Sequence, residues 1–315
     1  RAGSGWRRSS RVPASARAKF KEIENLLRGT PLMNVHSEDK VLQGLSAKEL
    51  FENGVRNYKK GDYKAALNNY NKLIALNPKN ANAYYRRGHT YAQLGKHNKA
   101  IVDYNKAIKL NPKDANAYYD RGVTYAQLGK YNEAHIDFNK AIELNPKNAD
   151  AYYNRGIVYH QLGKYKETIM EYNKAIVLNP KNENAYSSRG VTYVKLSKYN
   201  EAHIDHNKAI ELNPKGAIDY YNRSCFYSIT GYNLSAIWDL EKAIQIDPAF
   251  RKDAKIDSDF DNIRNYTGFK KLVGHAGENL IVSDGIRYKE AQVKVNEKAK
   301  QALKKLFSGK ATDQN

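Results

Sequence analysis

Five arginines recur along the chain at intervals of 34 residues, and an acidic residue follows each of them after 16 residues. The pairs are Arg87 and Asp103, Arg121 and Asp137, Arg155 and Glu171, Arg189 and Asp205, and Arg223 and Asp239. A row of guanidinium groups suits an anionic ligand, whereas base and acid at a constant separation favour internal ion pairs. In the preceding unit, Asn53 and Asn69 replace the base and the acid together. Removing one partner of a buried pair costs roughly 3–5 kcal/mol, so this joint replacement favours structural ion pairs.

Other combinations of reactive side chains are sparse. His203, Asp205 and His206 form an H-x-D-H pattern, but Asp205 belongs to the paired acids and no further ligand completes a four-ligand metal site. We therefore predict no metal, and we assign His206 to a core position. The glycines at 274 and 277 follow no predicted strand, so they form no phosphate loop. Without a readable Ser/His/Asp or Cys/His arrangement, the sequence predicts neither an enzyme nor a cofactor.

The elements that position these residues repeat with the same interval. Prolines mark the repeat at Pro78, Pro112, Pro146, Pro180, Pro214 and Pro248. Between two prolines, Tyr118 and Tyr125 lie on one predicted helix, and Phe138 and Ile142 lie on the next. Leu-Gly-Lys at 128–130 separates the helices, and Asn-Pro at 145–146 ends the second, because proline lacks the N–H that would continue it. Each unit is a helical hairpin that must stack on its neighbours to bury its apolar side.

The pattern within the hairpin resembles the tetratricopeptide repeat. The family's characteristic positions 4, 8, 11, 20, 24, 27 and 32 fall on Tyr84, Gly88, Tyr91, Ala100, Tyr104, Ala107 and Pro112. They fall again on Tyr152, Gly156, Tyr159, Tyr172, Ala175 and Pro180, with Thr168 in place of alanine. The fifth unit departs from the pattern, with Ser197 for the turn glycine and His206 for an aromatic residue. The resemblance implies an all-α, right-handed superhelical solenoid of antiparallel helical hairpins.

The chain divides by composition and periodicity into six predicted segments. They are a basic Arg/Ser-rich leader or tail (1–18), an N-terminal helix and linker (19–46), six repeats (47–250), capping helices (251–273), a linker (274–285), and a basic amphipathic helix and tail (286–315, with the helix from Tyr288 to Phe307). Ser46 and Glu49 predict a capping box at the start of the first repeat. The acid-free leader is typical of an organelle transit segment, with a basic tail or an expression remnant as the alternatives. A start at Arg1 in place of Met is expected of a trimmed or partial chain.

The resemblance also implies where a partner binds, because in this family the first helices line a concave groove. The predicted groove residues are Asn82, Tyr85, Arg86, His89, Asn116, Tyr119, Asp120, Gln127, Tyr153, Asn154, Gln161, Asn184, Tyr221 and Asn222. Amides can donate to and accept from the backbone of an extended peptide, and tyrosine offers a flat contact area with a hydroxyl group. The alternative is that some of these tyrosines pack between hairpins.

One specific version of the family, the carboxylate clamp for acidic chaperone tails, is not supported. Its Lys, Asn, Asn, Lys and Arg positions hold Tyr85, His89, Asp120, Asp150 and Asn154 in the second to fourth repeats. No other window of the chain fits the clamp.

The charge and the cysteine content narrow the remaining hypotheses. A net charge of +20 favours acidic partners, whether protein, nucleic acid or an anionic membrane surface. Cys225 is the only cysteine, so no intrachain disulfide forms and an intracellular setting, in the cytoplasm or an organelle, is favoured. No apolar run is long enough to span a membrane.

The favoured hypothesis is a non-catalytic protein–protein interaction scaffold, as a subunit or assembly factor of a larger complex. It would hold an extended or helical partner segment in the groove, with acidic protein or nucleic acid at its basic termini. The alternative is an RNA-binding or ribonucleoprotein-associated repeat protein that uses its basic surface and its 25 tyrosines. Membrane contact through Tyr288 to Phe307 is less favoured, because Ala and Val dominate the apolar face of that segment.

Overall fold

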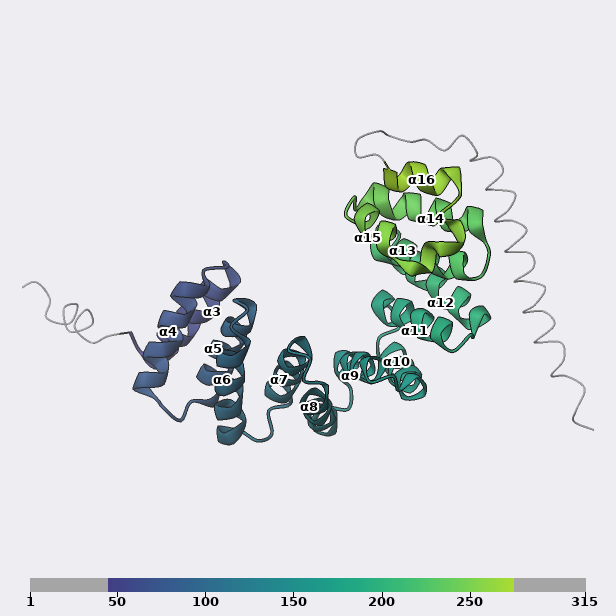
Figure 1. Ribbon diagram of the computed structural model, residues 1–315. Coiled ribbons are helices and arrows are strands. Elements are labelled where there is room, and N and C mark those ends of the chain that lie inside the picture. The colour runs from purple at the N-terminus through teal and green to yellow at the C-terminus, as the bar shows by residue number, and fades with distance from the viewer. Residues whose placement is uncertain (1–44, 275–315) are drawn as a thin grey trace, which may run out of the picture.

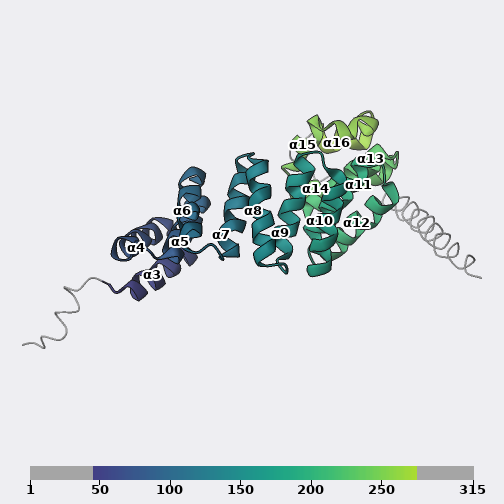
Figure 2. The same cartoon turned by 90° about the horizontal axis from the view of Figure 1, so that it is seen from below.

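The computed structural model describes residues 45–274, which form an array of α-helical hairpins without strands in that range. The hairpins are α3 (Ala47–Lys59) with α4 (Tyr63–Leu76), α5 (Ala81–Gln93) with α6 (His97–Leu110), α7 (Ala115–Gln127) with α8 (Tyr131–Leu144), α9 (Ala149–Gln161) with α10 (Tyr165–Leu178), α11 (Glu183–Lys195) with α12 (Tyr199–Leu212), and α13 (Ala217–Ile229) with α14 (Asn233–Ile246). The array bends into an arc, and the first helix of each hairpin lies on the inside of the curve (Figure 1). Seen from below, α7, α8 and α9 stand side by side in its middle (Figure 2). We call the surface of the first helices the inner face.

Local sequence sets where each helix begins and ends. The turn inside the third hairpin has Gly129 at φ 71°, a left-handed conformation that glycine adopts without steric cost. Between hairpins, the Asp114 carboxylate accepts hydrogen bonds from the backbone N–H groups of Asn116 and Ala117 and so caps α7. At the start of the array, the backbone N–H of Ser46 donates to Glu49, and the N–H of Glu49 donates to the Ser46 hydroxyl. The predicted capping box is therefore confirmed.

Within a hairpin, a glycine of the first helix faces a ring of the second. A Cβ atom on Gly88 would lie 3.1 Å from the Tyr104 ring, and one on Gly122 would lie 3.0 Å from the Phe138 ring. These approaches bring the two helices close together and bury the rings almost completely. The glycine at this position thus serves close packing, because any larger side chain would push the ring out of the core.

Three short helices cover the end of the sixth hairpin. They are α15 (Phe250–Ile256), the 3₁₀ helix η1 (Ser258–Ile263) and α16 (Thr267–Gly274), and they lie in the segment 251–273 where capping helices were predicted. Phe260, Ile263 and Phe269 are buried against the sixth hairpin and, together with residues of α13 and α14, form the largest apolar cluster of residues 45–274. No helix within residues 45–274 is long and apolar enough to cross a membrane. The expected leader (1–18), N-terminal helix (19–46), linker (274–285) and amphipathic helix (Tyr288 to Phe307) lie outside the described residues, apart from their margins.

Candidate functional site

The recurring arginines are held inside the array. Each pairs with the acid of its own hairpin through two hydrogen bonds, as Arg121 does with Asp137 at 2.7 and 2.6 Å. The equivalent pairs are Arg87 with Asp103, Arg155 with Glu171, Arg189 with Asp205, and Arg223 with Asp239. In the first hairpin the substitute Asn69 donates to the carbonyl of Ala65. The arginine row therefore offers no ladder of free guanidinium groups to an anion.

A third contact of each arginine joins neighbouring hairpins. The Nη1 group of Arg121 donates to the side-chain oxygen of Asn105, which belongs to the second helix of the preceding hairpin, at 2.6 Å. The other acceptors of this kind are Asn71, Asn139, Asn173 and Asn207. Sequence reasoning missed these asparagines, although they too recur every 34 residues. Their contacts fix how one hairpin sits on the next, and hence the curvature of the inner face.

The tyrosines of the inner face are also bonded between hairpins. Each contact joins position 5 of one hairpin to position 6 of the next, and we call these contacts the inner-face rungs. They are Tyr85 to Asp120 (2.8 Å), Tyr119 to Asn154 (2.9 Å), Tyr153 to Ser188 (3.2 Å), and Ser187 to Asn222 (3.1 Å). The Tyr119 ring also rests on the core ring of Phe138, with 5.9 Å between centroids. The half-buried tyrosines thus set the geometry of the inner face and expose only part of each ring.

Asp120 is the only carboxylate among these position-6 residues, and it lies in a half-buried place. Burial raises its pKa, while the hydrogen bond from the Tyr85 hydroxyl opposes that effect. Burial and the neighbouring Asp120 raise the pKa of the Tyr85 hydroxyl in turn, so the hydroxyl keeps its proton and remains the donor. The rung between the second and third hairpins is thus fixed in one hydrogen-bonding direction.

The predicted groove residues divide into three classes by exposure. Five amides are exposed: Asn82, Asn116, Gln127, Gln161 and Asn184. Eight residues are half-buried: Tyr85, Arg86, His89, Tyr119, Asp120, Tyr153, Asn154 and Asn222. Tyr221 is buried, only 7% exposed, because the rings of Phe250 and Phe260 of the cap pack against its ring and its hydroxyl donates to Asp257. Tyr221 is therefore not available to a partner in the way that the groove prediction requires.

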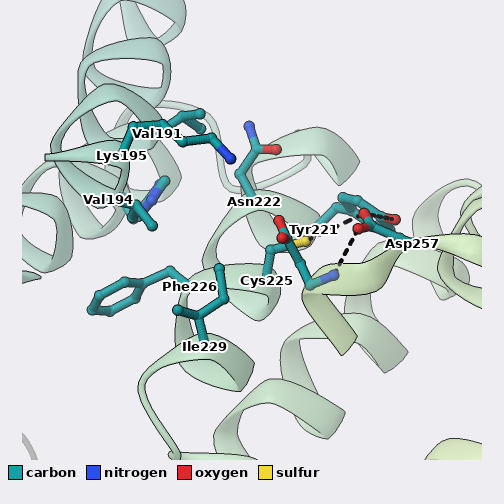
Figure 3. A pocket seen from close by; sticks show the side chains of 11 residues that line it. Val191, Val194, Lys195, Tyr221, Asn222, Cys225, Phe226, Ile229 and Asp257 are labelled. Atoms are coloured by element: carbon teal, nitrogen blue, oxygen red, sulfur yellow. Dashed lines mark hydrogen bonds between the residues drawn. The ribbon is translucent and has the colours of Figure 1, made fainter. Parts of the chain in front are cut away.

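A pocket of about 120 Å³ opens on the inner face at its C-terminal end, between α11, α13 and the start of η1. Val191 and Val194 lie on one side of it, and Cys225 and Asp257 lie opposite (Figure 3). Phe226 from α13 completes the apolar wall. Sequence reasoning assigned Val191, Tyr221 and Asn222 of this lining to the groove, but it missed Val194, Cys225, Phe226 and Asp257. One signal for a different surface here was available at position 13 of the repeat. This position holds glutamine in the second to fourth repeats but Lys195 and Ile229 in the fifth and sixth.

The pocket combines two carboxylates with a thiol. The reactive atoms of Cys225, Asp257 and Asp259 all lie within 4.8 Å of one another. The Oδ2 atom of Asp257 accepts from the Tyr221 hydroxyl at 2.8 Å and from the Cys225 thiol at 3.8 Å. Burial and the nearby carboxylates raise the pKa of Cys225, so the sulfur is held as a neutral thiol and not as a nucleophilic thiolate.

His206 lies behind this pocket, in the ring position of the fifth hairpin. It is fully buried, contacts Phe226 with ring centroids 5.7 Å apart, and neither ring nitrogen has a hydrogen-bond partner. Burial lowers its pKa to about 3, and the Arg223 guanidinium adds to the effect. Asp205 forms an ion pair with Arg189, so the side chains of the H-x-D-H pattern do not converge on one metal site.

The family models that match this chain all describe the same kind of repeat. A model described as TPR repeat matches residues 54–95, 88–129, 124–163 and 158–197, and one described as tetratricopeptide repeat matches residues 183–215 and 220–250. No curated protein matches the chain significantly.

Several solved structures share the fold. The MamA protein is 31% identical with a TM-score of 0.50, over 54% of this chain and 92% of that one. A tetratricopeptide repeat protein from Parabacteroides merdae is 24% identical with a TM-score of 0.55, over 82% of this chain and 95% of that one. The pilF protein of Pseudomonas aeruginosa is 15% identical with a TM-score of 0.58, over 68% of this chain and 94% of that one.

Proposed function

The chain belongs to the tetratricopeptide repeat family, and on that premise we propose that it is a non-catalytic scaffold that binds an extended segment of a protein partner along its inner face. Proteins built from these repeats are protein-interaction scaffolds. The partner would tie the chain into a larger complex as a subunit or an assembly factor.

The observation that supports this proposal is the row of exposed amides on the first helices. Asn82, Asn116 and Asn184 recur at one position of the hairpin, and Gln127 and Gln161 recur at another. Within residues 45–274, the side chains of Gln127 and Gln161 make no hydrogen bond. A primary amide can donate and accept at once, which matches the alternating N–H and C=O groups of an extended backbone. A segment that runs along the inner face would meet at least one such amide in each of the second to fifth hairpins.

The tyrosines contribute to this surface in a second way. Their hydroxyl groups are engaged in the inner-face rungs, so they hold the hairpins at a constant spacing for the amides. The rings themselves are half-buried, as Tyr119 is against Phe138, and this disfavours the nucleic-acid alternative, because a stacked base needs a freely accessible ring face. The basic termini, which that alternative also invokes, lie outside the described residues.

The test is an affinity co-purification at moderate salt, with and without nuclease. The variant Asn116→Ala/Gln127→Ala/Gln161→Ala removes three amides of the inner face. The matched control, Asn98→Ala/Asn132→Ala/Asn200→Ala, removes three exposed amides of the second helices. At about 1 kcal/mol per hydrogen bond, the inner-face variant should lose about 3 kcal/mol, a weakening of more than 100-fold.

We expect a protein partner that survives nuclease, is lost from the inner-face variant and is kept by the control. Equal retention by both variants would overturn the assignment of the inner face. Loss of all bound material on nuclease treatment would favour the nucleic-acid alternative.

A further inference from the structure

The pocket at the C-terminal end of the inner face has an unusual balance of charge. Asp257 and Asp259 both lie at it, and neither forms an ion pair with a basic residue within residues 45–274. Lys195 is the one positively charged side chain that lines the pocket. Burial raises the pKa of Asp259, the charge of Asp257 raises it further, and Lys195 opposes both only in part. The two carboxylates are thus left with an excess of negative charge in a partly desolvated place.

Most of the remaining lining is apolar, and one fully buried residue in it has polar atoms without a hydrogen-bond partner. Val194, Phe226 and Ile229 form a hydrophobic wall that leads towards the acids. His206 lines the same pocket, fully buried and without a hydrogen-bond partner on either ring nitrogen. A neutral imidazole presents one acceptor nitrogen, and carboxylates are acceptors only. The pocket therefore combines an apolar channel with a surplus of hydrogen-bond acceptors and negative charge.

We propose that this pocket anchors one lysine or arginine side chain of the partner segment, an inference that rests on the proposed scaffold function. Both side chains carry an aliphatic stem that packs on apolar walls and a cationic head that seeks carboxylates. The stem lies against Val194, Phe226 and Ile229, and the head reaches Asp259. The Asp257 carboxylate, which accepts from the Tyr221 hydroxyl and from the backbone N–H of Asp259, lies beside it and adds negative charge. An apolar occupant would desolvate both carboxylates without compensating them, and an acidic occupant would be repelled.

A divalent cation is the competing occupant, with Cys225, Asp257 and Asp259 as ligands. One observation counts against it. The hydrophobic wall of Val194, Phe226 and Ile229 has no role in holding a metal ion but matches the stem of a basic side chain.

The overall charge of the chain restricts the composition of the partner segment further. A chain with a net charge of +20 repels a strongly basic segment at long range, since the summed field acts before contact is made. The segment that suits both the field and the pocket is neutral or acidic along its length and carries a single basic residue. That residue fixes the register of the segment on the inner face.

The experiment uses the full chain and four pools of acetylated twelve-residue peptides. One central position holds Lys, Arg, Met or Glu, and the other positions are mixtures without basic residues. Binding of each pool is measured to the wild type, to Asp259→Asn, and to Asp253→Asn, a matched control that alters an exposed acid of α15. The Asn116→Ala/Gln127→Ala/Gln161→Ala variant reports on the scaffold function itself, and circular dichroism verifies that each variant is folded.

We expect the Lys and Arg pools to bind the wild type at least tenfold more tightly than the Met pool, and the Glu pool to bind most weakly. Asp259→Asn should reduce that preference to threefold or less, while Asp253→Asn preserves it. Equal binding of the Lys, Arg and Met pools, or a preference that survives Asp259→Asn, would overturn the anchor alone, provided that the inner-face variant still weakens every pool. If the wild type binds no peptide pool more tightly than the inner-face variant does, the anchor and the scaffold function are overturned together. Zinc binding by calorimetry that is lost in Asp259→Asn would assign the pocket to a metal and also overturn the anchor.

Discussion

His206 is the clearest mismatch between a side chain and its place in the fold, and replacing it with phenylalanine should stabilise the protein. The third hairpin provides the template, because residues 132–147 and 200–215 are identical except at Phe138 and His206. Both side chains are fully buried in the ring position, but the His206 ring nitrogens have no partner. Leaving a buried polar group unsatisfied costs about 1–3 kcal/mol, so His206→Phe should gain at least about 1 kcal/mol at pH 7.5.

The same substitution should remove part of the acid sensitivity. Burial lowers the pKa of His206 from its ordinary value of 6.5 to about 3 in the folded protein. The unfolded state therefore binds the proton first as the pH falls below 6.5, and folding stability falls with it. At pH 5 the unfolded imidazole is almost fully protonated and the buried one is still neutral, so at 1.36 kcal/mol per pH unit the wild type has lost about 2 kcal/mol. His206→Phe should lack that loss, although His203, whose pKa burial lowers to about 4, keeps its own contribution.

The assay is urea unfolding at pH 7.5 and pH 5, followed by far-ultraviolet circular dichroism. Repeat arrays can open one unit at a time, so amide exchange in α12 should be followed beside the global signal. The reciprocal variant Phe138→His is the matched control, and it should lose stability at pH 7.5 and acquire the additional loss at pH 5. An equal fall in stability between the two pH values for wild type and His206→Phe would refute the reasoning.

Two further predictions concern the backbone and the ion pairs. Ser197 has φ 55° where the other described hairpins have glycine, so Ser197→Gly should raise the free energy of unfolding by about 1 kcal/mol, and Gly163→Ser should lower it by a similar amount in the same urea titration. Asp239→Asn leaves the buried Arg223 guanidinium without its counter-charge and should cost roughly 3 kcal/mol. Adding Arg223→Asn should restore part of that loss, and a double-mutant cycle with additive effects would contradict the internal pairing.

The sequence was sufficient to predict the hairpins because their signals are local. Glycine at the turn, proline after the second helix and Asn or Asp at the cap each act within a few residues, and the 34-residue interval repeats them. The family resemblance and the all-α solenoid followed from this periodicity, and the family models agree with both. The joint replacement of base and acid in the first repeat likewise pointed to pairing inside the hairpin, which is where the structure places Arg121 and Asp137.

The availability of the inner-face side chains was decided only by the tertiary structure. The sequence assigned both Tyr119 and Gln127 to the groove. In the structure the Tyr119 hydroxyl accepts a hydrogen bond from Asn154 of the next hairpin, whereas Gln127 remains exposed. Tyr221 follows the same column as Tyr119 and yet lies beneath the cap, and the acids of the C-terminal pocket come from that non-repeating segment. Periodicity assigns a residue to a face of its helix, but the curvature of the array and the docking of the cap determine which atoms of that face still meet solvent.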